Sequence, residues 1–221
     1  HWFNTENGRA LNLMPNQNTV QTSTSSQDLK SFNNNGFTLN ATAFNTNINV
    51  NNGEYVSWAF RKAPKFHDIV TYTGNGTAGR TIPHSLNSTV GMIFVHRTDN
   101  QEDWTVWHRN LHTNSSGETT QFLRLNSNNG AFPLADSLSS SSNATSDIQA
   151  ASSTTFTVGN DSRVNANSAT YVAYIFAHNN SDGGFGPSAN QDIIKCGTYN
   201  GNGSTSSGPH IDLGFEPQWI L

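Results

Sequence analysis

Two tryptophans and an arginine in residues 104–109 are the strongest candidates for a binding site in this sequence. Indole rings offer flat faces to sugar rings, and a guanidinium group can donate hydrogen bonds to hydroxyls. In a strand, alternation places Trp104 and Trp107 on opposite faces, so at most one of them would belong to the core. We expect Trp107, beside Thr105 and Arg109, to be the exposed one. Trp107, Arg109 and Trp104 are therefore weak ligand-binding candidates, and packing in the core is the more common role for such residues.

Sequence patterns of enzymes are weak in this chain. Residues 74–79 have the glycine spacing of a dinucleotide-binding loop, but that site needs a following helix, and residues 80–83 are strand-like and end in proline. We interpret residues 74–79 as a turn. Serines are numerous, no Gly-x-Ser-x-Gly motif is present, and acidic residues are few. We assign no catalytic residues and expect a protein that is not an enzyme, with a glycan-cleaving tailspike as the weakest alternative.

Metal and cofactor sites are not indicated by spacing. None of the eight histidines stands in a His-x-His or His-Glu-x-x-His pattern, and the acidic residues 99–103 lack the glycine of a calcium-binding loop. We assign no metal ligands and no cofactor, and leave calcium binding open. Cys196 is the only cysteine, so no internal disulfide forms, and we expect a buried core thiol.

The composition indicates a β protein that is rich in turns. Charged residues make up only 12% of the 221 residues, while asparagine, serine, threonine and glycine are abundant. The net charge of −4 argues against nucleic-acid binding, and the chain contains no apolar run long enough to insert into a membrane. Such a composition is common among secreted and virion-surface β proteins.

The hydrophobic pattern predicts many short strands and no long helix. Residues 91–97 are apolar on both faces, which indicates a central strand with both faces covered. The serine-rich residues 136–147 are expected to form a surface loop. The predicted strands cover residues 36–41, 69–72, 91–97, 103–108, 120–125, 154–158 and 171–177. We predict an all-β fold of antiparallel β-sandwich or jelly-roll-like repeat units.

The chain also repeats itself. Residues 71–76 return as residues 198–203, which is 127 positions later. There is a second internal repeat. Residues 36–39 match residues 155–158, which come 119 positions later, and residues 55–60 match residues 171–176, which come 116 positions later. We therefore predict three parts, which are residues 1–67 (the back part of a preceding unit), 68–194 (a complete β-sandwich unit) and 195–221 (the opening strands of a following unit). Residues 178–191 would link two units, and we expect the chain to be an excerpt of a longer protein.

The order of several separated motifs resembles a known repeat domain. These motifs are residues 72–76, 82–86, 91–95, 104–109, 156–158, 164–167 and 171–174. Together they resemble the tandem repeat domain of tailed-bacteriophage virion structural and tail-fibre-like proteins, many of them from marine and cyanobacterial phages. The resemblance covers essentially the whole chain. A proline-containing turn of the family is altered in residues 86–91 and kept in residues 213–217. The family provides no catalytic residues to carry over.

The resemblance implies a non-enzymatic virion structural protein of a tail fibre, tail or surface appendage, located on the virion surface or extracellularly. Its expected partners are other copies of itself, neighbouring virion proteins and, through surface loops, host glycans. Two alternatives stay open, a carbohydrate-binding adhesion module and a self-assembling extracellular filament subunit. In the filament, the back part and the opening strands would complete one unit, within a chain or between chains.

Overall fold

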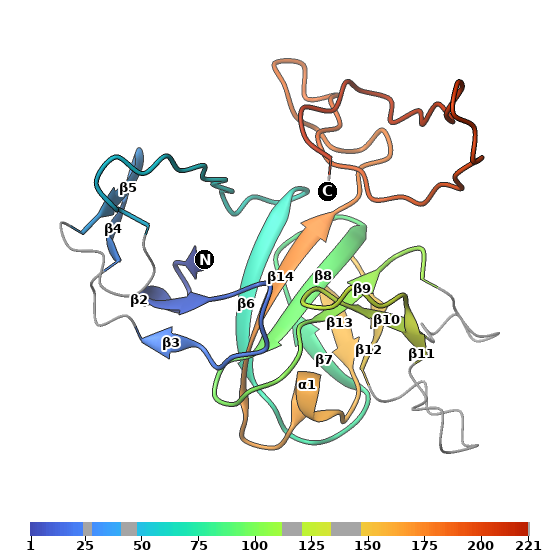
Figure 1. Cartoon of the computed structure of the whole chain (residues 1–221). Helices are drawn as coiled ribbons and strands as arrows, with labels where there is room; N and C mark the ends of the chain where they lie inside the picture. Colours follow the sequence, from blue (N-terminus) through green and yellow to red (C-terminus); the bar gives the residue numbers. More distant parts are fainter. Residues whose placement is uncertain (24–27, 41–47, 112–120, 134–146, 221) are drawn as a thin grey trace.

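The computed structural model describes residues 1–23, 28–40, 48–111, 121–133 and 147–220 (Figure 1). Within these ranges it contains fourteen strands and one short helix, α1 (Ser162–Asn165), so the predicted all-β, sandwich-like fold is confirmed. No helix in the described part of the chain is long and apolar enough to cross a membrane. The predicted loop at 136–147 lies, except for its last residue, outside the described residues. The strands are β1 (Trp2–Asn4), β2 (Gly8–Leu13), β3 (Thr22–Ser23), β4 (Leu29–Asn33), β5 (Gly36–Leu39), β6 (His67–Thr73), β7 (Arg80–Pro83), β8 (Val90–Arg97), β9 (Thr105–His108), β10 (Gln121–Arg124), β11 (Phe132–Pro133), β12 (Ile148–Ala151), β13 (Thr155–Val158) and β14 (Thr170–Ala177).

A six-stranded antiparallel sheet forms the centre of the molecule, in the order β11-β10-β9-β8-β14-β6. Strand β14 lies between the other two long strands, so that Tyr174 stands opposite Ile69 on β6 and Phe94 on β8. Seven of the eight β14 residues are buried. This burial explains why β14 and β8 are apolar on both faces, since a strand covered on both sides has no solvent-facing row.

Each face of this sheet is covered by a smaller layer. On one face, Ile93 and Val95 of β8 belong to a cluster with Ile82, Phe156 and Val158 of the sheet β12-β13-β7. On the other face, apolar side chains of β14 and β8 form a second cluster with Leu13 of the sheet β1-β2-β3. The second cluster contains Leu13, Phe94, Trp104, Val106, Val172, Tyr174 and Phe176. The core therefore consists of two apolar layers on either side of β14.

Trp2 anchors the β1-β2-β3 sheet to this second layer. Its ring lies 5.0 Å from the ring of Trp104 and 5.1 Å from that of Tyr174, both in edge-to-face geometry. Asn4, also on β1, donates a hydrogen bond of 2.8 Å to the Tyr174 hydroxyl. The first strand of the chain is thus held against the central strand of the sheet, although about 170 residues separate them.

The hairpins β4–β5 and β12–β13 have the same geometry. Each has a β-bulge after its first residue pair. The main-chain carbonyl of Asp28 accepts a hydrogen bond from Asn40 N (2.9 Å), and that of Asp147 accepts one from Gly159 N (2.6 Å). The paired residues are Leu29–Leu39, Ser31–Thr38 and Phe32–Phe37 in the first hairpin, and Ile148–Val158, Ala150–Thr157 and Ala151–Phe156 in the second. Corresponding residues are 119 positions apart, as residues 36–39 and 155–158 are in the second internal repeat.

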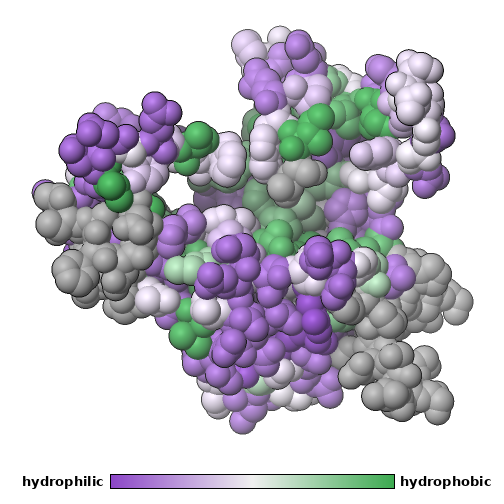
Figure 2. All heavy atoms as spheres, in the orientation of Figure 1, coloured by the Kyte–Doolittle hydropathy of each residue, from purple (hydrophilic) through white to green (hydrophobic). Residues whose placement is uncertain are grey.

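Residues 54–61 and 195–220 belong to no strand in the described part of the chain, and residues 195–220 form the looped segment at the top of Figure 1. This differs from the prediction of opening strands after residue 194. A strand needs a neighbour for its ladder hydrogen bonds, and no sheet of the described residues includes either segment. Both segments expose large apolar side chains, including Val56, Trp58, Tyr199 and Ile220. Figure 2 shows apolar surface, in green, over the C-terminal segment at the top of the molecule.

Candidate functional site

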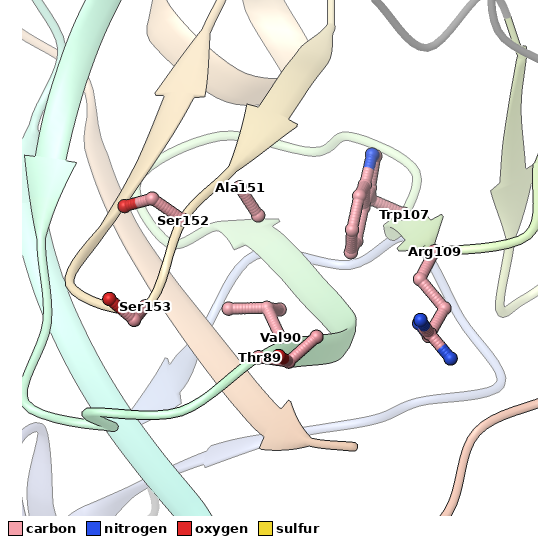
Figure 3. A pocket seen from close by; sticks show the side chains of 7 residues that line it. All are labelled: Thr89, Val90, Trp107, Arg109, Ala151, Ser152 and Ser153. Carbon is pink, nitrogen blue, oxygen red and sulfur yellow. The ribbon is translucent and has the colours of Figure 1, made fainter. Parts of the chain in front are cut away.

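A shallow depression lies between β8, β9 and the turn of the β12–β13 hairpin. It has a volume of about 290 Å³ and is lined by Thr89, Val90, Trp107, Arg109, Ala151, Ser152 and Ser153. In Figure 3, Trp107 and Arg109 lie on one side of the depression and Ser152 and Ser153 on the other. The structure thus brings two of the three predicted site residues, Trp107 and Arg109, to one concave surface.

Trp107 contributes mainly to the core. It is only 7% exposed and stands opposite Ile93 on β8, within the first apolar cluster. The sequence predicted that it would be the exposed tryptophan, and this expectation is wrong. Because most of the indole face is covered, little of it is available for stacking on a sugar ring.

Trp104 lies on the opposite side of the sheet and is completely buried. Its ring stacks on His96 with centroids 4.4 Å apart, and its Nε1 donates a hydrogen bond of 3.0 Å to the Met14 carbonyl. Burial lowers the pKa of His96, so the imidazole in this stack is neutral at pH 7. The prediction that at most one of the two tryptophans belongs to the core is wrong, because the sheet is covered on both faces.

Arg109 points to a small polar group behind the depression. Its Nη1 lies 2.7 Å from His178 Nε2, and the Cys196 main-chain N–H lies 3.1 Å from His178 Nδ1. Burial and the Arg109 charge lower the pKa of His178, so its ring is neutral at pH 7 and can accept from only one of these donors. Burial also raises the pKa of the Cys196 thiol to about 11. The thiol is therefore protonated and buried, as predicted for a core cysteine, and is a poor nucleophile.

The serines of the depression serve the hairpin turn. The Ser152 hydroxyl donates a hydrogen bond of 3.1 Å to the Thr155 carbonyl and accepts one of 3.0 Å from the Thr155 main-chain N–H. A hydroxyl engaged in this way closes a turn and is not activated for attack. Within the described ranges, no three His, Cys, Asp or Glu side chains gather closely enough to hold a metal ion.

A second hollow lies between the β1–β2 hairpin and the edge of the large sheet. Its walls are formed mainly by threonine and tyrosine side chains and by Glu6, with Thr71, Thr73, Thr98 and Thr170 among them. Tyr72, which also lines it, turns its hydroxyl away to donate to the Val164 carbonyl. The hollow therefore presents mainly hydroxyl groups, and Glu6, which also pairs with Lys62, is the carboxylate among the residues that line it.

A polar site around Asn165 was not predicted from the sequence. Asn165 of α1 accepts a hydrogen bond from Asn75 N (2.9 Å) and donates to the carbonyls of Thr77 (2.9 Å) and Gly159 (2.7 Å). A Cβ on Gly74 would lie 2.0 Å from the Ala166 carbonyl oxygen, so only glycine fits there. The loop runs directly into β7, which confirms that residues 74–79 form a turn and not a nucleotide-binding loop.

Comparison with known protein families gives a match over nearly the whole chain. The profile of a family described as a domain of unknown function, DUF7483, matches residues 2–221. No curated protein and no solved structure matches the chain. Since the match spans nearly its full length, the chain belongs to the DUF7483 family.

Proposed function

We propose that this chain is a non-enzymatic structural protein of a bacteriophage virion, a β-rich repeat in a tail fibre, tail or surface appendage. The observation that carries the proposal is the pair of matching hairpins, β4–β5 and β12–β13, with the same register, bulge and carbonyl hydrogen bond. Recurrence of one building block within a chain is expected of proteins that form extended arrays. The virion assignment itself is supported by the resemblance of the motif order to phage repeat domains.

The side chains around the depression support a structural role for the protein more than a catalytic one. The Cys196 thiol is protonated, the Ser152 hydroxyl closes a turn, and Trp107 fills the core. The Cys196 thiol and the Ser152 hydroxyl are thus engaged in maintaining the fold. Neighbouring virion proteins and further copies of the chain are the proposed partners, and host glycans could contact its hydroxyl-rich surface.

Immunoelectron microscopy tests the virion role. Antibodies against the purified chain would be applied to intact phage particles whose genome encodes it, with pre-immune serum as the control. We expect gold label on the tail or its fibres. Particles that carry no label and contain no peptide of the chain by mass spectrometry would contradict the proposal.

A further inference from the structure

We infer that residues 55–61 of one copy of the chain pair with residues 194–220 of a second copy, so that copies join head to tail. The inference deepens the proposed structural role, on which it rests, by naming the partner and the surface. It starts from these two segments, which flank the complete unit in the sequence and expose large apolar side chains.

The internal repeat aligns both segments with strands of the large sheet of the complete unit. Residues 55–60 correspond to β14, while residues 194–200 correspond to β6 and residues 217–220 to β8. In the complete unit, β14 lies between β6 and β8 and pairs with both. Residues 55–61 are therefore a central strand without its two neighbours, and residues 194–220 contain the sequences of those two neighbours.

The registers of β14 predict which residues would pair. Ala173 stands opposite Val70 on β6, and the corresponding positions in the two segments are Ser57 and Gly197. Phe176 stands opposite Met92 on β8, and the corresponding positions are Phe60 and Trp219. The proposal thus specifies single residue pairs.

Both segments leave large apolar side chains in solvent. Val56 is 80% exposed and Trp58 69%, while Tyr199 is 70% and Ile220 78% exposed. Contiguous apolar groups at a surface mark interaction sites, and an extended segment without a neighbour invites another strand. By comparison with the complete unit, residues 194–220 are the segment that would cover residues 55–61.

Within one copy, the aromatic side chains of the two segments are already in contact, but the two segments are not in the register that β14 predicts. The Trp219 ring lies 6.1 Å from that of Phe60, the pair that the β14–β8 register predicts, and 6.2 Å from that of Trp58. The same register places position 196 opposite Trp58. Cys196, however, is buried against Gly91 and Ala177 of the complete unit, while Trp58 remains in solvent.

A second copy removes this conflict. Within one chain, Cys196 contacts the complete unit and not Trp58, whereas a second molecule can approach until its residues 194–220 meet residues 55–61. Each chain then offers one receiving segment and one donated segment, which meet at Phe60 and Trp219 in the single chain. When each copy donates to one neighbour and receives from another, the interface produces a ring or an open filament.

Disulfide trapping tests this pairing in the full-length chain, with Cys196→Ala as the background. Ser57→Cys is introduced in one preparation and Gly197→Cys in another, with affinity tags of different length. Ser57 is exposed, and no atom lies within 4 Å of a Cβ at Gly197, so both thiols fit. Paired positions in an antiparallel sheet lie at about 4.5–5.5 Å between Cα atoms, within disulfide range. We expect a disulfide-linked heterodimer after mild oxidation of the mixture, and a ladder of oligomers from the double variant.

The matched control is Gly201→Cys, four residues out of register and equally free of steric conflict. We expect it to give no heterodimer with Ser57→Cys. Equal trapping at positions 197 and 201, or no heterodimer at either, would overturn the inference. A double variant that closes within single chains, without a heterodimer in the mixture, would also overturn it, because the receiving segment would then bind its own chain.

The two proposals can fail separately. Label on virions without disulfide trapping would leave the virion role and remove the head-to-tail joint. Trapping without label on virions would leave the joint and remove the virion role.

Discussion

The carboxylate of Asp147 and the guanidinium of Arg163 form a two-point ion pair at the edge of the core. Arg163 Nη2 lies 2.9 Å from Oδ2 and Nε lies 3.3 Å from Oδ1, and the Asp147 side chain is completely buried. The guanidinium also lies 4.5 Å from the centre of the Phe122 ring. Burial raises the pKa of Asp147 to about 6, against the opposing effect of the Arg163 charge. Without its partner, the ionised carboxylate would be costly to bury.

We therefore expect Arg163→Met to lower the free energy of unfolding by about 3–5 kcal/mol at about pH 7.5. Near pH 5 the loss should be smaller, because protonated Asp147 needs no counter-ion. Urea unfolding at both pH values measures this. Arg97→Met, which removes a more exposed pair with Asp99, is the control, with an expected loss below about 1 kcal/mol. Equal losses at the two sites would contradict the prediction.

His67 should make the fold sensitive to acid. Its Nδ1 lies 3.1 Å from the Ile175 carbonyl, its ring stacks on Phe176, and burial lowers its pKa from 6.5 to about 4. The stability due to neutral His67 is complete above pH 6.5 and is lost as the pH falls towards 4, to a limit of about 3 kcal/mol. Asp147, whose pKa is raised, changes stability in the opposite direction over part of this range.

The variant His67→Gln separates the two effects, since glutamine can donate to Ile175 and does not titrate. We expect its urea midpoint to fall less between about pH 7 and pH 4.5 than that of the wild-type chain. Parallel midpoint curves for the two proteins would show that His67 does not carry the acid sensitivity.

Gly74 should tolerate no side chain. An alanine Cβ would lie 2.0 Å from the Ala166 carbonyl oxygen, so the turn between β6 and β7 would have to move away from α1. We expect Gly74→Ala to cost about 2–3 kcal/mol in thermal unfolding followed by circular dichroism. Gly130→Ala, where no atom is within 4 Å, should stay within about 0.5 kcal/mol of the wild type. Comparable losses at the two glycines would refute this explanation.

Trp104 and Trp58 should differ strongly in their contribution to stability. Trp104 is fully buried against His96 and Trp2, so Trp104→Ala is expected to cost about 3–5 kcal/mol. Trp58 is 69% exposed, and Trp58→Ala should change the stability of the dilute, monomeric chain by less than about 1 kcal/mol. Chemical unfolding of both variants at low concentration measures the difference. A small loss for Trp104→Ala would argue against the second apolar layer.

The long central strands could be predicted from sequence because they are apolar on both faces. The predictions at 91–97 and 171–177 agree with β8 (Val90–Arg97) and β14 (Thr170–Ala177) to within one residue at each end. None of the strands β1, β2 and β3 was predicted: β1 and β3 have only two or three residues, and β2 (Gly8–Leu13) does not alternate between buried and exposed positions. The covering of the second face, and with it the burial of both tryptophans, was therefore missed.

The candidate site was harder to predict than the fold. The turn at residues 74–79 followed from the proline after it, but its partner Asn165 lies some 90 residues further along the chain. The expected linker at residues 178–191 is tied to the unit by Asn179, which donates to the Lys65 carbonyl and accepts from Ile193 N. Such contacts depend on topology and leave no local pattern of spacing.

The place of β14 in the sheet has a consequence for biosynthesis. Strands β6 and β8 leave the ribosome before β14, although β14 lies between them in the sheet. Strand β14 follows only after residues 98–169 have been synthesised. At usual elongation rates of about 5–20 residues per second, the two nascent strands wait for several seconds with an open slot between them. During that time a strand from a neighbouring nascent chain could occupy the slot. Slower initiation on the messenger, which spaces ribosomes further apart, should therefore raise the yield of correctly folded protein.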